Sequence, residues 1–149
     1  MKIRKAQKAD ISTIVDFQVR MAKETEDLEL NPKVTTKGVE YIFDNPEHGF
    51  YLLSEEREEI TGSLMILYEW SDWRNNKVIW IHSVYIKPEW RKKGIFGKMY
   101  AFIKELVASD EMYGGIRLYV DKRNNNAQKV YEHIGMSKEH YVLYEWMQS

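Results

Sequence analysis

The chain has 149 residues, a length that suits one domain with a core of its own. Its 22 basic and 23 acidic residues leave a formal net charge of -1, which argues against general nucleic-acid binding, because that function needs a positively charged surface. No cysteine is present, so disulfides, thiolate metal sites and cysteine nucleophiles are excluded. The charged N-terminus and the lack of a long apolar run predict a cytoplasmic protein that does not bind a membrane.

Two helices are predicted in the first third of the chain. Asp10 suits a helix N-cap, and apolar residues recur after it at helical spacing until the acidic run 24–29, where the helix should fray. Thr35 or Thr36 is expected to cap the second helix, and Asn45-Pro46 to end it.

Runs of apolar, β-branched and aromatic residues predict six strands, and Gly114-Gly115 is expected to end the connection before the fifth. The strands are Lys2–Lys5, Phe50–Ser54, Ile60–Tyr68, Val78–Lys87, Ile116–Val120 and Tyr141–Met147. Two more helices follow Gly94 and the polar segment 121–126. The order β-α-α-β-β-β-α-β-α-β predicts a single mixed α/β domain over residues 1–149, with one twisted mixed sheet of about six to seven strands and helices on both faces. The unit from Val78 to Val120 should be a right-handed parallel crossover.

The stretch from Val78 to Phe102 carries the first candidate site. Pro88 should end the strand, and Arg91-Lys92-Lys93-Gly94-Ile95-Phe96-Gly97 then leads into an amphipathic helix. A helix start has unpaired N–H groups and a partial positive charge, so such a basic loop can hold a phosphate or pyrophosphate. An ordinary turn with solvated Lys and Arg is the alternative. The spacing excludes a Walker A loop, because Gly97-Lys98 is followed by Met99 and lacks the earlier glycine.

Two motifs in the second half resemble those of the GNAT superfamily of acyl-CoA-dependent N-acetyltransferases. The first, Arg91-x-x-Gly94-x-x-Gly97, follows a strand; the family pattern is Arg/Gln-x-x-Gly-x-Gly/Ala, so Phe96 stands at its third position. The second is Asn124-x-x-Ala127-x-x-x-Tyr131-x-x-x-Gly135-Met136, with Met136 where the family has phenylalanine. The resemblance covers most of the chain and is weakest before Phe50. It implies transfer of an acetyl group from acetyl-CoA to a primary amine of a small molecule or peptide.

The resemblance also implies where acetyl-CoA binds. A pantetheine arm can pair like an extra strand with the segment Val84–Ile86, past the point where two parallel strands splay, and backbone donors of Lys92–Lys98 can hold the pyrophosphate. Arg91, Lys92 and Lys93 add charge, and Asn124 would cap its helix in any fold. The implied cofactor-binding set is Val84, Tyr85, Ile86, Arg91, Lys92, Lys93, Gly94, Ile95, Phe96, Gly97, Lys98, Asn124 and Ala127.

Tyr131 and His82 are the catalytic candidates. The resemblance implies that the phenol of Tyr131 donates a proton to the departing CoA thiolate, the alternative being a core residue of an amphipathic helix. His82 stands in the central strand, where some GNAT members carry a carboxylate; its imidazole can take the proton of the attacking amine, or be structural. A backbone N–H near Val84 can stabilise the oxyanion. Without a cysteine nucleophile we expect direct attack in a ternary complex. His133 and His140 lack partners at metal-ligand spacing, so no metal is predicted.

The acceptor should approach from the side opposite CoA, near the first two helices, the Trp70–Arg74 turn and the last strand. The carboxylates of Glu24, Glu26, Asp27, Glu69 and Asp72 could favour a cationic amine there. A solvated helix end, with Trp70 and Trp73 packed on the sheet or in a homodimer contact, is the alternative. Two rival functions stay open: a non-catalytic acyl-CoA-binding or regulatory domain of the same fold, and a structural interaction domain that uses its exposed tryptophans.

Overall fold

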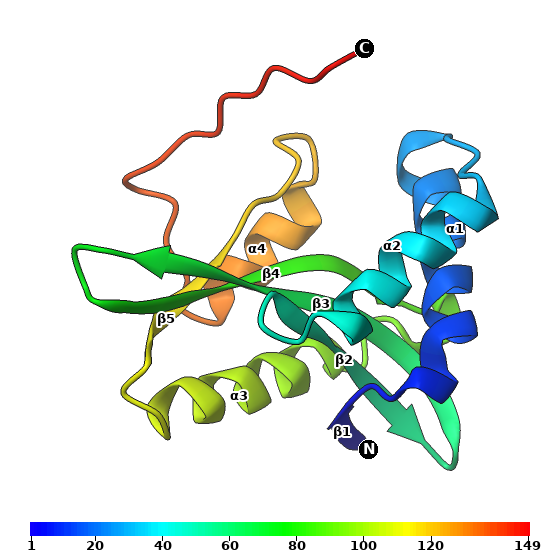
Figure 1. Cartoon of the computed structure of the whole chain (residues 1–149), viewed down its shortest axis with the longest axis horizontal. Helices are drawn as coiled ribbons and strands as arrows, with labels where there is room; N and C mark the ends of the chain where they lie inside the picture. The colour runs from blue at the N-terminus through cyan, green and yellow to red at the C-terminus, as the bar shows by residue number, and fades with distance from the viewer. The chain divides into compact units, whose positions relative to one another are not determined.

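The structure is a computed structural model that describes residues 1–149, and the chain divides into two units, Met1–Arg117 and Leu118–Ser149, each described by itself. Figure 1 follows the chain from the N-terminus in blue to the C-terminus in red. The strands and α-helices are β1 (Lys2–Lys5), α1 (Ile11–Glu26), α2 (Pro32–Asp44), β2 (Gly49–Glu56), β3 (Glu59–Ser71), β4 (Asn76–Ile86), α3 (Ile95–Ala108), β5 (Tyr113–Leu118) and α4 (Asn125–His133).

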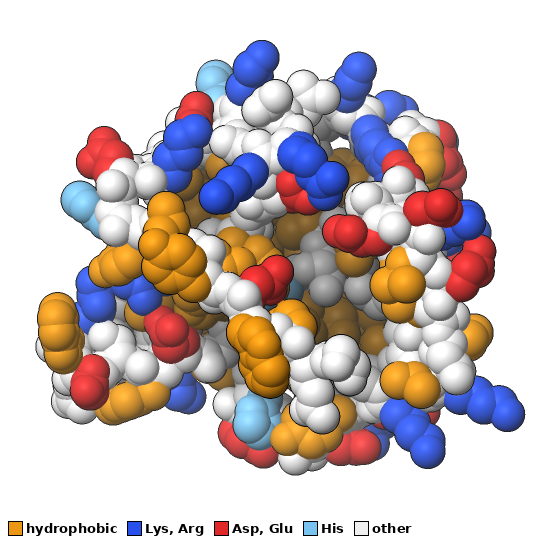
Figure 2. Space-filling view, turned by 90° about the horizontal axis from the view of Figure 1, so that it is seen from above, with side chains coloured by type: hydrophobic (Ala, Val, Ile, Leu, Met, Phe, Trp, Pro, Cys, Tyr) orange, Lys and Arg blue, Asp and Glu red, His pale blue; other side chains and the backbone are white.

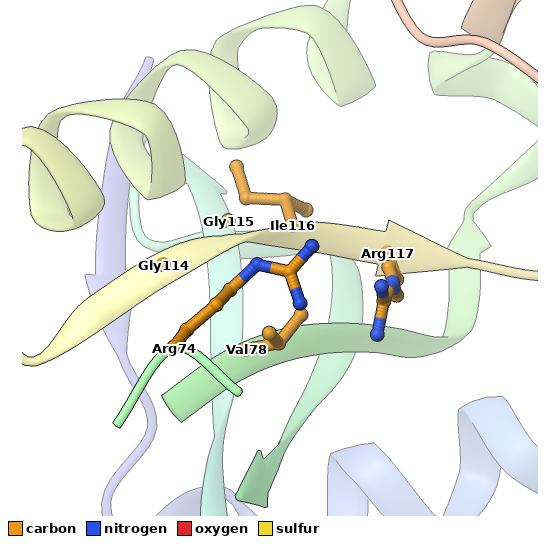
Figure 3. Close-up of a pocket in the computed structure, with 6 residues that line it drawn as sticks. All are labelled: Arg74, Val78, Gly114, Gly115, Ile116 and Arg117. Carbon is orange, nitrogen blue, oxygen red and sulfur yellow. The ribbon is translucent and has the colours of Figure 1, made fainter. Parts of the chain in front are cut away.

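The sheet has five strands in the order β1-β2-β3-β4-β5, and the first four pair antiparallel with their neighbours. The backbone N–H of Lys77 donates to the carbonyl of Met112 at 2.8 Å, so the first residues of β4 and β5 adjoin. Because both strands leave this point in the same direction, β4 and β5 run in parallel, with α3 as their connection (Figure 3). The sheet is therefore mixed, and β4 is the strand at which it changes from antiparallel to parallel.

Helices cover both faces of the sheet, which is why its central strands are apolar on both sides. Ile14 of α1 and Val39 of α2 belong to one core cluster with Leu53 of β2. On the other face, α3 contributes the fully buried Met99 and Ile103. Figure 1 shows α3 on the opposite side of the sheet from α1 and α2. The predicted mixed α/β class with helices on both faces is confirmed.

The predicted start of the second helix was wrong by one turn. Asn31 is the N-cap of α2, because its side-chain oxygen accepts from the backbone N–H of Lys33 at 2.9 Å, and Pro32 suits the first helical position. Thr36 instead lies within the helix and donates its hydroxyl to the carbonyl of Pro32 at 2.7 Å. Of the predicted boundaries, β1 and the end of α2 before Pro46 are confirmed.

The strand count is lower than predicted, because no strand forms at 141–147. The alternating aromatic residues of that segment fit a strand, but residues 141–147 adopt neither strand nor helix in the structure. Gly114 and Gly115 do not end a connection but lie within β5. A Cβ at Gly114 would clash with the side chain of Asn76 at the start of β4, so a larger residue would require that side chain to move.

No helix combines the length and the hydropathy that crossing a bilayer requires. On the face shown in Figure 2, basic and acidic side chains are interspersed, in keeping with the formal net charge of -1.

Candidate functional site at the end of the central strand

A β-bulge interrupts β4 where the predicted site begins. Ser63 of β3 opposes Tyr85, and Met65 opposes His82, so the single residue Leu64 faces two residues of β4. The extra residue breaks the ladder and bends the strand. It also changes the side-chain alternation, so that His82 and Tyr85 both lie on the face covered by α1 and α2. The Tyr85 ring packs on Phe17 of α1, with ring centroids 5.0 Å apart.

The bulge places Ser83 at φ 53, a left-handed conformation that few residues other than glycine adopt. Sequence reasoning missed it, because Ser83-Val84 looks like ordinary strand and only the pairing with β3 reveals the insertion. Past the bulge, Val84–Ile86 has a free side. The two strands start together, but β4 has 11 residues and β5 only 6, so the end of β4 has no strand neighbour on the β5 side. Its backbone groups on that side can pair with an extended ligand.

His82 is half-buried, and its ring stacks on Trp80 with centroids 6.0 Å apart and planes inclined by 19°. Burial lowers the pKa of His82 below its ordinary value of 6.5, because the charged imidazolium is harder to desolvate than the neutral ring. The imidazole is therefore neutral at pH 7 and able to accept a proton.

The loop after β4 presents backbone to solvent at the start of α3. Lys92 and Gly94 have φ values of 63° and 74°, so the backbone is in the left-handed region at two positions before the helix begins. Gly94 is the N-cap of α3 and has no side chain to satisfy the first N–H groups of the helix. A Cβ added to Gly94 or to Gly97 would meet no atom within 4 Å, so the space over both residues is open. An anion can approach the backbone of this cradle closely.

Arg91 anchors this loop to its surroundings. Its Nε donates to the carbonyl of Ile86 at 2.9 Å, and its guanidinium pairs with both carboxylate oxygens of Glu24 in α1, one of them at 2.9 Å. The guanidinium lowers the pKa of Glu24, which therefore stays ionised. Sequence reasoning placed Glu24 on the acceptor side and missed this pair, because the partners are 67 residues apart.

The other side chains of the loop differ in exposure. Lys92, Lys93 and Lys98 are exposed, and the ammonium of Lys93 lies 4.8 Å from the ring centroid of Trp90. The Phe96 ring packs along α3 against Tyr100, with centroids 6.2 Å apart. Phe96 thus contacts a neighbour on its own helix, while Ile95 is buried in the core.

The second motif lies in the other unit, around α4. Asn124 is the N-cap of that helix, as predicted, and its side-chain oxygen accepts from the backbone N–H of Ala127 at 3.0 Å. Gly135 has φ 98 just past the helix end, the conformation expected for it. Burial raises the pKa of Tyr131 above its ordinary value of 10, so this phenol is protonated at neutral pH and can donate.

The residues predicted to line the acceptor side differ in their contacts and in their exposure. Glu69 pairs with Arg117 at 2.9 Å, and Asp72 accepts from the backbone N–H of Trp73 at 2.9 Å. Trp70 and Trp73 are 56% and 94% exposed, so Trp73 is not packed on the sheet.

The chain belongs to the acetyltransferase (GNAT) family, whose family model matches residues 19–136. No significant match is found among curated proteins.

Among solved structures, a possible acetyltransferase from Clostridium difficile 630 is similar over 99% of this chain and 97% of its own, with 40% identity and a TM-score of 0.92. A predicted acetyltransferase with acetyl-CoA from Clostridium acetobutylicum shares the fold at 21% identity, with coverage of 97% and 95% and a TM-score of 0.75. The glucosamine-6-phosphate N-acetyltransferase of Arabidopsis thaliana shares it at 17% identity, with coverage of 99% and 98% and a TM-score of 0.74.

Proposed function

We propose that this chain is an N-acetyltransferase that transfers an acetyl group from acetyl-CoA to a primary amine of a small molecule or peptide. The observation that carries the proposal is the end of β4, where a bulged strand with one unpaired side leads directly into an open, glycine-capped helix start. The acetyl-CoA of the Clostridium acetobutylicum structure and the amine substrate named for the Arabidopsis enzyme support it. The family match spans both units, which supports a single acetyltransferase domain over residues 1–149.

The chain's residues fit the two parts of CoA that need different partners. The pantetheine arm carries amides, and the free side of Val84–Ile86 offers backbone groups to them, although the Ile86 carbonyl already accepts from Arg91. The pyrophosphate carries negative charge, and the N–H groups from Lys92 to Lys98 would hold it at the positive end of α3. Arg91 would act by fixing this loop against Glu24 and Ile86. Asn124, the N-cap of α4, and Ala127, in the first turn of that helix, remain part of the proposed cofactor site.

The reaction then needs two proton transfers. His82, neutral at pH 7, would take the proton from the ammonium of the acceptor, directly or through water, because only the free amine is a nucleophile. The amine nitrogen attacks the thioester carbonyl carbon, and a backbone N–H near Val84 stabilises the oxyanion. When the C–S bond breaks, the phenol of Tyr131 donates its proton to the thiolate, so that an amide and free CoA leave.

A screen of primary amines with detection of released thiol tests this function. We expect acetyl-CoA consumption with at least one class of amine, and a rise of the melting temperature on adding acetyl-CoA alone, because a ligand that binds the folded state stabilises it. A melting temperature that acetyl-CoA leaves unchanged would refute the cofactor site. Binding without turnover on any amine would instead support the non-catalytic acyl-CoA-binding domain, for which Phe96 at the glycine position of the motif is the supporting observation.

A further inference from the structure

A small hollow lies at the beginning of β4 and β5, at the opposite end of β4 from the cofactor loop. Its volume is about 210 Å³, and Figure 3 shows the residues around it. The hollow is lined by Arg74, Val78, Gly114, Gly115, Ile116 and Arg117. Whole ligand pockets measure roughly 300–1,000 Å³, so the hollow suits one polar group of a ligand rather than a complete small molecule.

Two arginines give this hollow a positive charge. Arg74 extends from the turn between β3 and β4, and its guanidinium makes one long hydrogen bond, to the Ser71 hydroxyl at 3.3 Å, and pairs with no carboxylate. Arg117 comes from β5 and pairs with Glu69 at 2.9 Å. The planar donors of Arg74 and Arg117 match a carboxylate or a phosphate.

The diglycine in β5 leaves room for such a group. Gly114 faces the side chain of Asn76, and a Cβ on Gly115 would meet no atom within 4 Å. The wall of the hollow between the two arginines is thus bare backbone, which Figure 3 shows as the strand segment behind the Arg74 side chain.

The hollow lies on the same face of β4 as the proposed base. Val78, Trp80 and His82 alternate along β4 and point to one side, and Glu69, the partner of Arg117, is directly opposite Val78. At about 3.3 Å per residue, the four residues from Val78 to His82 span roughly 13 Å. An acceptor whose amine lies at His82 would therefore extend past Trp80 and place a group roughly 13 Å from that amine in the hollow.

We propose that Arg74 and Arg117 bind an anionic group of the amine acceptor, a carboxylate or a phosphate, in an inference that rests on the proposed acetyltransferase function. The substrate class is an amine with its negative charge about 13 Å away, the length of about four residues of extended peptide. A short peptide with a free carboxyl terminus and an aminoalkyl phosphate both have this chemistry.

The test compares tetraglycine, tetraglycine amide and an ω-aminoalkyl phosphate of the same length as acceptors. We expect kcat/KM for at least one of the two anionic acceptors to exceed that of the amide by about ten- to a hundredfold, because a charge-assisted hydrogen bond contributes a free energy of that size. The anionic acceptor with the higher kcat/KM shows whether the site prefers a carboxylate or a phosphate. Arg74→Gln should remove this preference, and Arg74→Glu should reverse it. Arg57→Gln, in the exposed turn between β2 and β3, is the matched control and should change nothing.

Two failures can be told apart. If the amide is acetylated as efficiently as both anionic acceptors, or if the preference survives Arg74→Gln, the anion subsite is refuted while the acetyltransferase function stands. If acetyl-CoA neither raises the melting temperature nor is consumed with any amine, the proposed function itself falls, and the subsite falls with it.

Discussion

Replacing Gly97 by alanine should stabilise the free protein and weaken its binding of acetyl-CoA. Gly97 is in the first turn of α3 without a positive φ, and an added Cβ would meet no atom within 4 Å. Alanine in a helix is favoured over glycine by about 0.5–1 kcal/mol, so the substitution should raise the free energy of unfolding by that amount. The same methyl group would occupy the open space through which a pyrophosphate approaches the cradle.

For a chain of this size, the stability gain corresponds to a melting temperature roughly 1–4 °C higher without ligand. A tenfold loss of cofactor affinity would reduce the stabilisation at a fixed, saturating acetyl-CoA concentration by about 1.4 kcal/mol, which is larger than the gain. The two effects therefore have opposite signs and can be read from the same experiment.

Thermal unfolding with and without acetyl-CoA measures both effects, and Gly38→Ala is the matched control. Gly38 is within α2, and its added Cβ would also meet no atom within 4 Å, so this variant should gain the same stability and keep the full response to acetyl-CoA. If Gly97→Ala keeps the full response as well, the cofactor does not approach the backbone at this position, and the assignment of the cradle is refuted.

Three further variants test other parts of the account. Tyr131→Phe should slow turnover by roughly ten- to a thousandfold if the phenol is the general acid, and a normal rate would remove it from the chemistry. Burial lowers the pKa of His82, so the rate of the wild type should fall only as the pH drops through that lowered pKa. His82→Ala should flatten this acidic limb of the pH–rate profile, and an unchanged limb would show that His82 is structural. Leu64→Ala, at a fully buried position opposite the bulge, should cost about 2–5 kcal/mol in urea unfolding, whereas the same change at the exposed Leu28 should cost less than about 0.5 kcal/mol, and equal losses would contradict the packing.

The sequence predicts those features of the fold that depend on residues close together in the chain. Lys2–Lys5, the glycine that starts α3 and the Asn124 cap follow from residue types at short spacing, and all three are found in the structure. The motif residues between Arg91 and Gly97 occupy one loop and one helix start, as their spacing indicated.

What the sequence could not predict depends on partners far along the chain. The bulge at Ser83 exists only relative to β3, and the pairing of Arg91 with Glu24 needs α1 to pack beside the loop. The strand expected at 141–147 fails for the same reason, since an alternating pattern does not supply a neighbouring strand. Gly114 was predicted to end a connection, although it lies within β5, where a Cβ would meet the side chain of the distant residue Asn76.

The most direct test of the central claim is a crystal structure of this chain with acetyl-CoA. We predict pyrophosphate oxygens within about 2.7–3.2 Å of backbone nitrogens between Lys92 and Lys98, and pantetheine amides paired with the backbone of Val84–Ile86. Acetyl-CoA bound elsewhere on the chain, with the free side of β4 and the cradle at Gly94 both empty at saturating ligand, would contradict the account.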